Sequence, residues 1–205
     1  MGSAKNNRVG IPVWIEAFHV LSKETRAIPG HAWQGSEVAE AIRWWIQTVD
    51  RMPPRTLDHK DRRLPVRIFT DGACEGEASE STTYGAVLFD PEDGTVEAFG
   101  AEMCEELKSL LSQDGLKTQL ITKAEILPML VSRIIWSLRL LDRDVLHYVD
   151  NEGSRLSTIK GNSPSRESAW LIHAFWETEV MNRSRSWLSR VPTECNIGDG
   201  PSRGE

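Results

Sequence analysis

The sequence has few cysteines and no long apolar run, and both absences narrow the class of protein. Cys74, Cys104 and Cys195 are odd in number and widely spaced, which fits neither a disulfide framework nor a zinc site. No run of about 18 apolar residues is present, and no basic segment followed by an apolar one marks a secretory signal. We therefore expect a globular protein of a reducing intracellular compartment, the cytoplasm or the nucleus, with no membrane partner.

A strongly basic region is also lacking. The net charge is −6, and it is unevenly distributed: residues 1–65 carry 10 Lys/Arg and 7 Asp/Glu, residues 66–150 carry 7 and 16, and residues 151–205 carry 7 and 7. The three segments therefore have net charges of +3, −9 and 0. Because binding of nucleic acid by bulk electrostatics needs a basic surface, the acidic middle segment is more typical of a site that collects divalent cations.

The apolar pattern divides the chain into two parts. Apolar residues make up 40% of the 205 residues, which is sufficient for a core. Residues 1–63 are expected to form an N-terminal helical arm, with an amphipathic helix that begins at Ser36 and ends before Pro53. The polar, proline-bounded stretch that follows is typical of a linker. Residues 64–205 are expected to form the main domain.

The main domain begins with three predicted strands. The segments "VRIFTD" (66–71), "TTYGAVLFD" (82–90) and "TVEAFGAEM" (95–103) have the apolar content and alternation of strands. The turn "PEDG" joins the second and third into a hairpin. The sequence therefore predicts three consecutive antiparallel strands, followed by a loop that extends through residue 118.

Helices and strands alternate in the rest of the domain. We expect a long helix over about 122–141, with its start near Thr122 to Ala124 because Pro128 is tolerated only in a first turn. A strand over 144–150, helices over 152–160 and 165–182, and a final strand over 184–191 follow. This order predicts an α/β fold, a mixed sheet flanked by helices. The buried side of the long helix is expected to carry Ile126, Leu127, Leu130, Ile134, Ile135 and Leu138.

Acidic residues recur at the ends of these predicted elements. Asp71 ends the first strand, Glu125 lies in the opening turn of the long helix, and Asp150 ends the fourth strand. Asp199 lies in a polar loop after the last strand. Each residue alone suits a turn or a cap, but a cluster of carboxylates repels itself and favours Mg²⁺, which prefers oxygen ligands.

Four segments together resemble a known family. "IFTDGAC...YGAVLF", "KAEILPMLVSRIIW", "VDNEGSRLSTIKGNS" and "WLSRVPTECNIGDGPSRG" resemble, in this order, the ribonuclease H domains that follow the reverse transcriptase in retroelements. The closing "VP...N..D.PSR" is similar to the DIRS-like, tyrosine-recombinase group. The resemblance covers about residues 64–203. It implies a ribonuclease H-like fold and a metal-dependent endonuclease that cleaves the RNA strand of RNA-DNA hybrids, within a reverse transcriptase polyprotein.

The resemblance also implies roles for individual residues. Two Mg²⁺ ions, or Mn²⁺ in their place, would activate the attacking water and stabilise the leaving 3′ oxygen. The implied catalytic residues and metal ligands are Asp71, Glu125, Asp150 and Asp199. The implied contacts to the hybrid are Gly72, Ala73, Asn151, Arg155 and Lys160. Asn151 is equally suited to cap the helix over 152–160, and Arg155 and Lys160 also suit a solvated helix face.

Three features depart from the family pattern. No histidine lies between His173 and Asp199, where these enzymes often carry one. The sequence has six residues after Asp199, so we do not expect the helix on which the family mounts that aspartate. Acidic residues also follow Asp71 at Glu75, Glu77 and Glu80. These departures leave two alternatives open, a catalytically silent ribonuclease H-like scaffold in a polymerase assembly and a related DNA nuclease.

Overall fold

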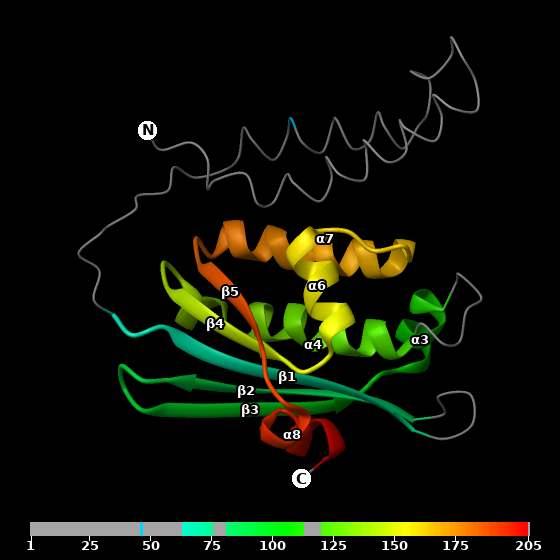
Figure 1. Cartoon of the computed structure of the whole chain (residues 1–205), viewed down its shortest axis with the longest axis horizontal. Coiled ribbons are helices and arrows are strands. Elements are labelled where there is room, and N and C mark those ends of the chain that lie inside the picture. The colour runs from blue at the N-terminus through cyan, green and yellow to red at the C-terminus, as the bar shows by residue number, and fades with distance from the viewer. Residues whose placement is uncertain (1–45, 47–62, 76–80, 113–119, 205) are drawn as a thin grey trace.

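The computed structural model describes residues 46, 63–75, 81–112 and 120–204 (Figure 1). Apart from Ile46 and Arg63, the predicted N-terminal arm and its helix lie outside the described residues, as do Glu77 and Glu80 of the acidic run. Among the described helices, none is both long and apolar enough to cross a membrane.

A five-stranded mixed sheet forms the centre of the domain, with the strand order β3-β2-β1-β4-β5 (Figure 1). The strands are β1 (Val66–Glu75), β2 (Ser81–Asp90), β3 (Thr95–Glu102), β4 (Asp144–Val149) and β5 (Arg185–Arg190). β2 pairs with β1 and β3 in antiparallel fashion, whereas β1–β4 and β4–β5 are parallel. The predicted antiparallel meander followed by parallel strands is therefore confirmed.

Burial follows the position of each strand in the sheet. The central strand β1 buries Val66, Ile68 and Thr70, whereas the edge strand β3 alternates between half-buried and exposed residues. The hairpin between β2 and β3 closes at Gly94, whose φ of 72° favours glycine and whose N–H donates to the Asp90 carbonyl at 2.9 Å. The "PEDG" turn is thus formed as the sequence predicts.

Helices cover both faces of the sheet. They are α3 (Glu105–Leu111), α4 (Leu120–Ile135), α5 (Ser137–Leu140), α6 (Glu152–Lys160), α7 (Arg166–Met181) and α8 (Asp199–Arg203), with a 3-10 helix at Thr193–Cys195. α4 and α7 pack together on one face, and α8 lies on the other (Figure 1). The prediction of an uninterrupted loop through residue 118 was wrong, because α3 occupies part of it, with two glutamates in its first turn and Leu111 buried.

The long helix also differs from its prediction. α4 begins at Leu120, so Pro128 lies inside it rather than in the first turn. α4 ends at Ile135, and the side chains of Trp136 and Leu140 fill the core between β1, β2 and β4. The buried face of this stretch runs through Ser132, Arg133, Trp136 and Leu140. Three residues expected in the core are therefore exposed, namely Ile134, Ile135 and Leu138, with exposures of 57%, 54% and 89%. Ile126 and Leu127 are buried as expected.

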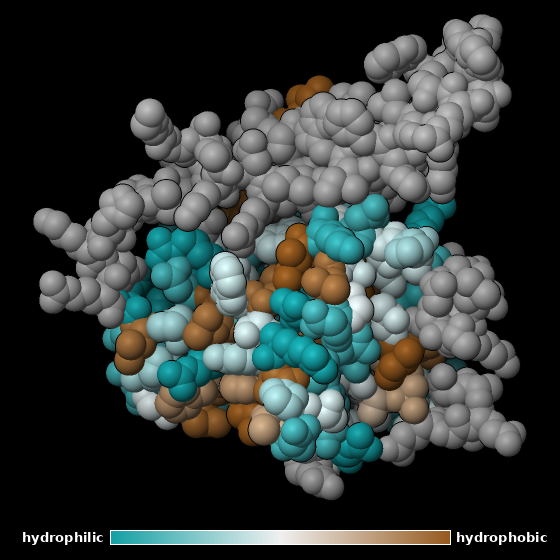
Figure 2. Space-filling model, in the orientation of Figure 1, coloured by the Kyte–Doolittle hydropathy of each residue, from teal (hydrophilic) through white to brown (hydrophobic). Residues whose placement is uncertain are grey.

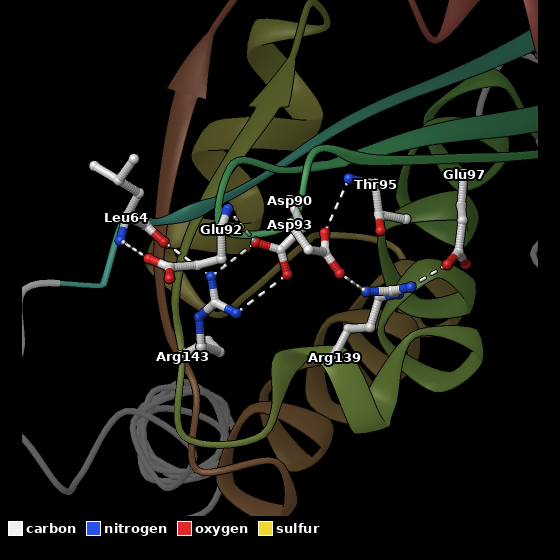
Figure 3. Close-up of polar contacts among 8 residues, drawn as sticks. All are labelled: Leu64, Asp90, Glu92, Asp93, Thr95, Glu97, Arg139 and Arg143. Atoms are coloured by element: carbon white, nitrogen blue, oxygen red, sulfur yellow. Dashed lines mark hydrogen bonds and ion pairs between the residues drawn. The ribbon is translucent and has the colours of Figure 1, made fainter.

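A buried ion pair fixes the start of β1 (Figure 3). Arg143 donates to both carboxylate oxygens of Asp90, at 2.9 and 3.1 Å, and to the carbonyl of Leu64 at 2.9 Å. The N–H of Leu64 in turn donates to Glu92 at 2.8 Å. Arg139 adds ion pairs to two further acidic residues of the hairpin, Asp93 and Glu97. The start of β1 is therefore held against β2 by this ion pair, and Asp71 lies toward the other end of β1.

The surface shows no single apolar area in the view of Figure 2. Polar and apolar side chains alternate over the described part of that face. The exposed apolar residues of α6 and β5 include Leu156, Ile159 and Trp187.

Candidate metal centre

The sheet register places two aspartates side by side. The pairing of β1 with β4 ends at Thr70 and Val149; Asp71 is the next residue of β1, and Asp150 directly follows β4. Neighbouring strands lie about 4.8 Å apart, and residues in register point to the same face of a sheet. The two carboxylates therefore meet at the point where β4 stops and β1 continues to Glu75.

The third carboxylate belongs to Glu125 of α4. The backbone N–H of Gly72 donates to the carboxylate of Glu125, beyond the last residue of β1 that pairs with β4. This approach needs glycine, because a Cβ at Gly72 would lie 2.3 Å from the carbonyl oxygen of Ala124. That carbonyl would bond to the N–H of residue 128 in a regular helix, and Pro128 has none. The carbonyl that Pro128 leaves without a helical donor therefore lies against Gly72 of β1.

These three residues form one cluster. One carboxylate oxygen from each of Asp71, Glu125 and Asp150 lies within 4.8 Å of the other two. Glu125 Oε2 and Asp150 Oδ1 are buried and accept no hydrogen bond from the described residues. Buried oxygens without partners cost free energy, and a hard divalent cation is the partner that such oxygens bind best. The donor set therefore fits Mg²⁺ or Mn²⁺.

The electrostatics of the cluster agree with this fit. Burial raises the pKa of Glu125 to about 9, with Asp71 and Asp150 adding to the rise and the Gly72 N–H opposing it. Burial also raises the pKa of Asp71; a hydrogen bond from Ser202 lowers it, the negative charges of Asp150 and Asp199 raise it, and Arg203 lowers it. Without a cation, Glu125 thus holds a proton at neutral pH, and a bound cation would take the place of that proton.

Comparison with known proteins identifies the fold. No protein-family model matches the sequence, and no curated protein matches it. Type 1 ribonuclease H from the halophilic archaeon Halobacterium salinarum has a TM-score of 0.50 at 15% identity, over 68% of this chain and 96% of that one. The N-terminal ribonuclease H domain of a Mycobacterium tuberculosis protein, solved as a maltose-binding protein fusion, has a TM-score of 0.52 at 14% identity, over 68% and 91%. The chain has a ribonuclease H-like fold.

A further solved structure with this ribonuclease H-like fold is that of a protein isolated from compost. It is a type 1 ribonuclease H isolated by a metagenomic approach, with a TM-score of 0.50 at 16% identity, over 68% of this chain and 93% of that one. Identities this low show the fold alone. The resemblance to the DIRS-like group therefore stays a prediction from sequence motifs.

Asp199 is placed at the rim of the cluster of this ribonuclease H-like domain. It begins α8, so the expectation that no helix would carry it was wrong. Its Oδ1 accepts a hydrogen bond from Arg203 Nε at 2.7 Å, and its side chain is 39% exposed. It is not among the three residues whose oxygens meet within 4.8 Å, yet its charge raises the pKa of Asp71. Its role as a metal ligand stays a prediction.

The expected hybrid contacts lie around the start and the length of α6. Asn151 Oδ1 accepts from the Ser154 N–H at 3.0 Å, so the capping alternative for Asn151 is confirmed. Arg155 donates to both oxygens of Glu152, at 2.9 and 2.7 Å, and to the Leu188 carbonyl at 3.3 Å. Lys160 is exposed at the end of the helix, and Gly72 and Ala73 are buried in β1. Binding of nucleic acid by these residues stays a prediction.

Two residues that contact Asp71 were not among the expected site residues. Ser202 Oγ lies 2.6 Å from Asp71 Oδ2, and Asn196 Nδ2 donates to Asp71 Oδ1 at 3.4 Å. Both side chains are buried. The sequence signal was their place in "N..D.PSR", three residues on either side of Asp199. Their contact with β1 could not be read from that spacing.

Proposed function

We propose that this protein is a metal-dependent endonuclease that hydrolyses the RNA strand of RNA-DNA hybrids. The observation that carries the proposal is the convergence of Asp71, Glu125 and Asp150, from three separate elements, within a ribonuclease H-like fold. Two of these residues leave a buried carboxylate oxygen without a hydrogen-bond partner among the described residues. A purely structural role for the cluster would not offset the cost of that arrangement.

The cations follow from the donor set. Asp71, Glu125 and Asp150, with Asp199 at the rim, would hold Mg²⁺, and Mn²⁺ could substitute because it also accepts oxygen ligands. When bound, such ions lower the pKa of a water molecule and stabilise the negative charge that develops at a scissile phosphate.

The residues of the chain prepare the site for this chemistry. The Gly72 N–H orients the carboxylate of Glu125, and Glu125 would release its proton when a cation binds. A hybrid would lie with its shallow minor groove and 2′-hydroxyl groups toward this edge of the sheet. Asn151 caps α6 through its oxygen, so its Nδ2 group would be the donor toward the hybrid. Lys160 would serve a phosphate better than Arg155, whose guanidinium already bonds to Glu152 and Leu188.

The setting of the domain rests on the sequence motifs. We infer that residues 64–205 are the nuclease domain of a retroelement polyprotein of the DIRS-like group and that residues 1–63 connect it to a reverse transcriptase domain. Co-purification of the chain with the polymerase region of such a polyprotein tests this setting, and the absence of any complex would contradict it.

The activity is tested with the purified chain and labelled RNA-DNA hybrid, RNA duplex and DNA duplex, each with Mg²⁺ or Mn²⁺. We expect cleavage of RNA in the hybrid only, and a loss of at least about 10³-fold in Asp71→Asn and Asp150→Asn, because each removes a charged ligand. Asp144→Asn is the matched control, since Asp144 is an exposed residue of the same strand that pairs with Arg185.

Two other results would redirect the proposal. Cleavage of no substrate with either metal would favour the catalytically silent scaffold. Cleavage of duplex DNA would favour the related DNA nuclease.

A further inference from the structure

We infer that Ser202 and Asn196 are positioning residues that hold the Asp71 carboxylate in the orientation needed to bind divalent cations. The inference rests on the proposed function, since it assigns these residues to that same site. Asp71 lies where β1, β4 and α4 meet, and its two oxygens are bonded by residues that follow it by 125 and 131 positions in the sequence.

A row of small residues across the sheet brings α8 to Asp71. Asp71 pairs with Gly85 of β2, and Gly85 pairs with Gly100 of β3, so the three positions share one face of the sheet. A Cβ at Gly85 would lie 2.4 Å from the backbone nitrogen of Ser202, and one at Gly100 would lie 2.0 Å from the carbonyl oxygen of Pro201. The two glycines therefore leave a groove that α8 fills, with Ser202 at the end nearest Asp71.

Ser202 sits between two acceptors. Its Oγ lies 2.6 Å from Asp71 Oδ2 and 2.8 Å from the Asp199 carbonyl, and its side chain is 1% exposed. A hydroxyl group has one proton and can donate it to one acceptor at a time. Bonds to a charged oxygen are stronger than bonds to a neutral carbonyl, so the proton goes to the ionised Asp71. Ser202 thus holds Oδ2 when Asp71 is in its metal-binding form.

Asn196 holds the other oxygen through an amide whose orientation is fixed. Its Oδ1 accepts from the Gly198 N–H at 3.2 Å, which places Nδ2 on the side of β1. Nδ2 then donates to the Thr70 carbonyl at 3.1 Å and to Asp71 Oδ1 at 3.4 Å. Since one donor bonds to the backbone of β1 and to the carboxylate, the position of Asp71 is fixed relative to its own strand.

Partners of this kind influence cation binding without touching the cation. Hydrogen bonds that orient a ligand are worth about 10- to 100-fold in metal affinity. A residue that only stabilises the fold would change the unfolding temperature and leave the affinity of the folded protein unchanged. The two roles are therefore separable by a binding measurement on folded protein.

The test is titration of the full-length chain with Mn²⁺, without substrate, by calorimetry. We expect Ser202→Ala and Asn196→Ala each to weaken Mn²⁺ binding by about 10- to 100-fold, and kcat on hybrid to fall while KM for the hybrid stays unchanged. Ser132→Ala is the matched control, because Ser132 is buried and its hydroxyl donates to the carbonyl three residues earlier in its helix, as Ser202 can. Among the described residues, no carboxylate accepts a hydrogen bond from Ser132. The control is expected to bind Mn²⁺ like the unmodified protein.

The outcomes separate this inference from the proposed function. Unchanged Mn²⁺ affinity in a folded Ser202→Ala protein would overturn the positioning role and leave the nuclease proposal in place. If the variants bind Mn²⁺ more weakly and the unmodified protein cleaves no hybrid, the positioning role is supported and the nuclease proposal is overturned. An unmodified protein that binds no Mn²⁺ would overturn both. If Ser202→Ala does not fold, the same criteria apply to Asn196→Ala.

Discussion

The metal-free protein should lose stability as pH rises, and Glu125→Gln should remove most of that loss. The pKa of Glu125 is about 9 in the folded protein against an ordinary value of 4.5. The folded state therefore holds a proton that the unfolded state releases, so the unfolding free energy decreases as pH rises from 4.5 to 9. Glutamine at position 125 keeps an oxygen that can accept from the Gly72 N–H but has no proton to lose.

The size of the effect follows from the interval between the two pKa values. One group that stays protonated only in the folded state changes the unfolding free energy by about 1.4 kcal/mol per pH unit. The interval from pH 4.5 to pH 7 is about 2.5 pH units, which gives about 3 kcal/mol for Glu125. The raised pKa of Asp71 acts in the same direction and leaves a smaller slope in the Glu125→Gln protein.

The assay is urea unfolding of both proteins at pH 4.5, 5.5 and 7 after removal of divalent cations. Other titrating groups contribute to both proteins, so the quantity of interest is the unfolding free energy of Glu125→Gln minus that of the unmodified chain. We expect this difference to grow by about 3 kcal/mol between pH 4.5 and 7. A difference that stays constant with pH would refute the buried, protonated Glu125. Added Mg²⁺ at pH 7 should stabilise the unmodified protein more than the variant.

Two further predictions concern the groove under α8 and the buried ion pair at the start of β1. Gly100→Ala should displace α8, because the new Cβ would lie 2.0 Å from the Pro201 carbonyl oxygen. Calorimetry should then find the Mn²⁺ affinity reduced by about 10-fold or more. An unchanged Mn²⁺ affinity would contradict the role of the groove. Arg143→Ala should lower the free energy of unfolding in urea by about 3 kcal/mol or more, because it leaves the buried Asp90 without its ion pair. Arg185→Ala, which removes an exposed ion pair, should lower it by less than about 1 kcal/mol. Equal losses in the two variants would refute this reasoning.

The sheet could be predicted because its strands carry local signals. The alternation in β1 and the Gly94 turn act within a few residues. The parallel pairing of β1 with β4, which brings Asp71 beside Asp150, joins segments that are far apart in the sequence. The sequence predicts a loop over segment 105–111, although Leu107, Leu110 and Leu111 have helical spacing. A helix this short gives a weak periodic signal, and its stability comes from tertiary packing.

The start of α4 could not be predicted because a tertiary contact overrides a local rule. Proline is normally excluded from the interior of a helix. Here the carbonyl that Pro128 leaves without a helical donor lies against Gly72. Asn196 and Ser202 were missed for a similar reason. Their contact with Asp71 depends on two glycines in other strands, and no local pattern connects positions more than 100 residues apart.

The most direct test of the account is a crystal structure of the chain soaked in Mn²⁺, with the ion located by its anomalous scattering. We expect a peak in contact with carboxylate oxygens of Asp71, Glu125 and Asp150, and its absence in crystals of Asp71→Asn grown and soaked in the same way. A Mn²⁺ peak bound elsewhere, with these three carboxylates turned apart, would contradict the metal centre and the nuclease proposed from it.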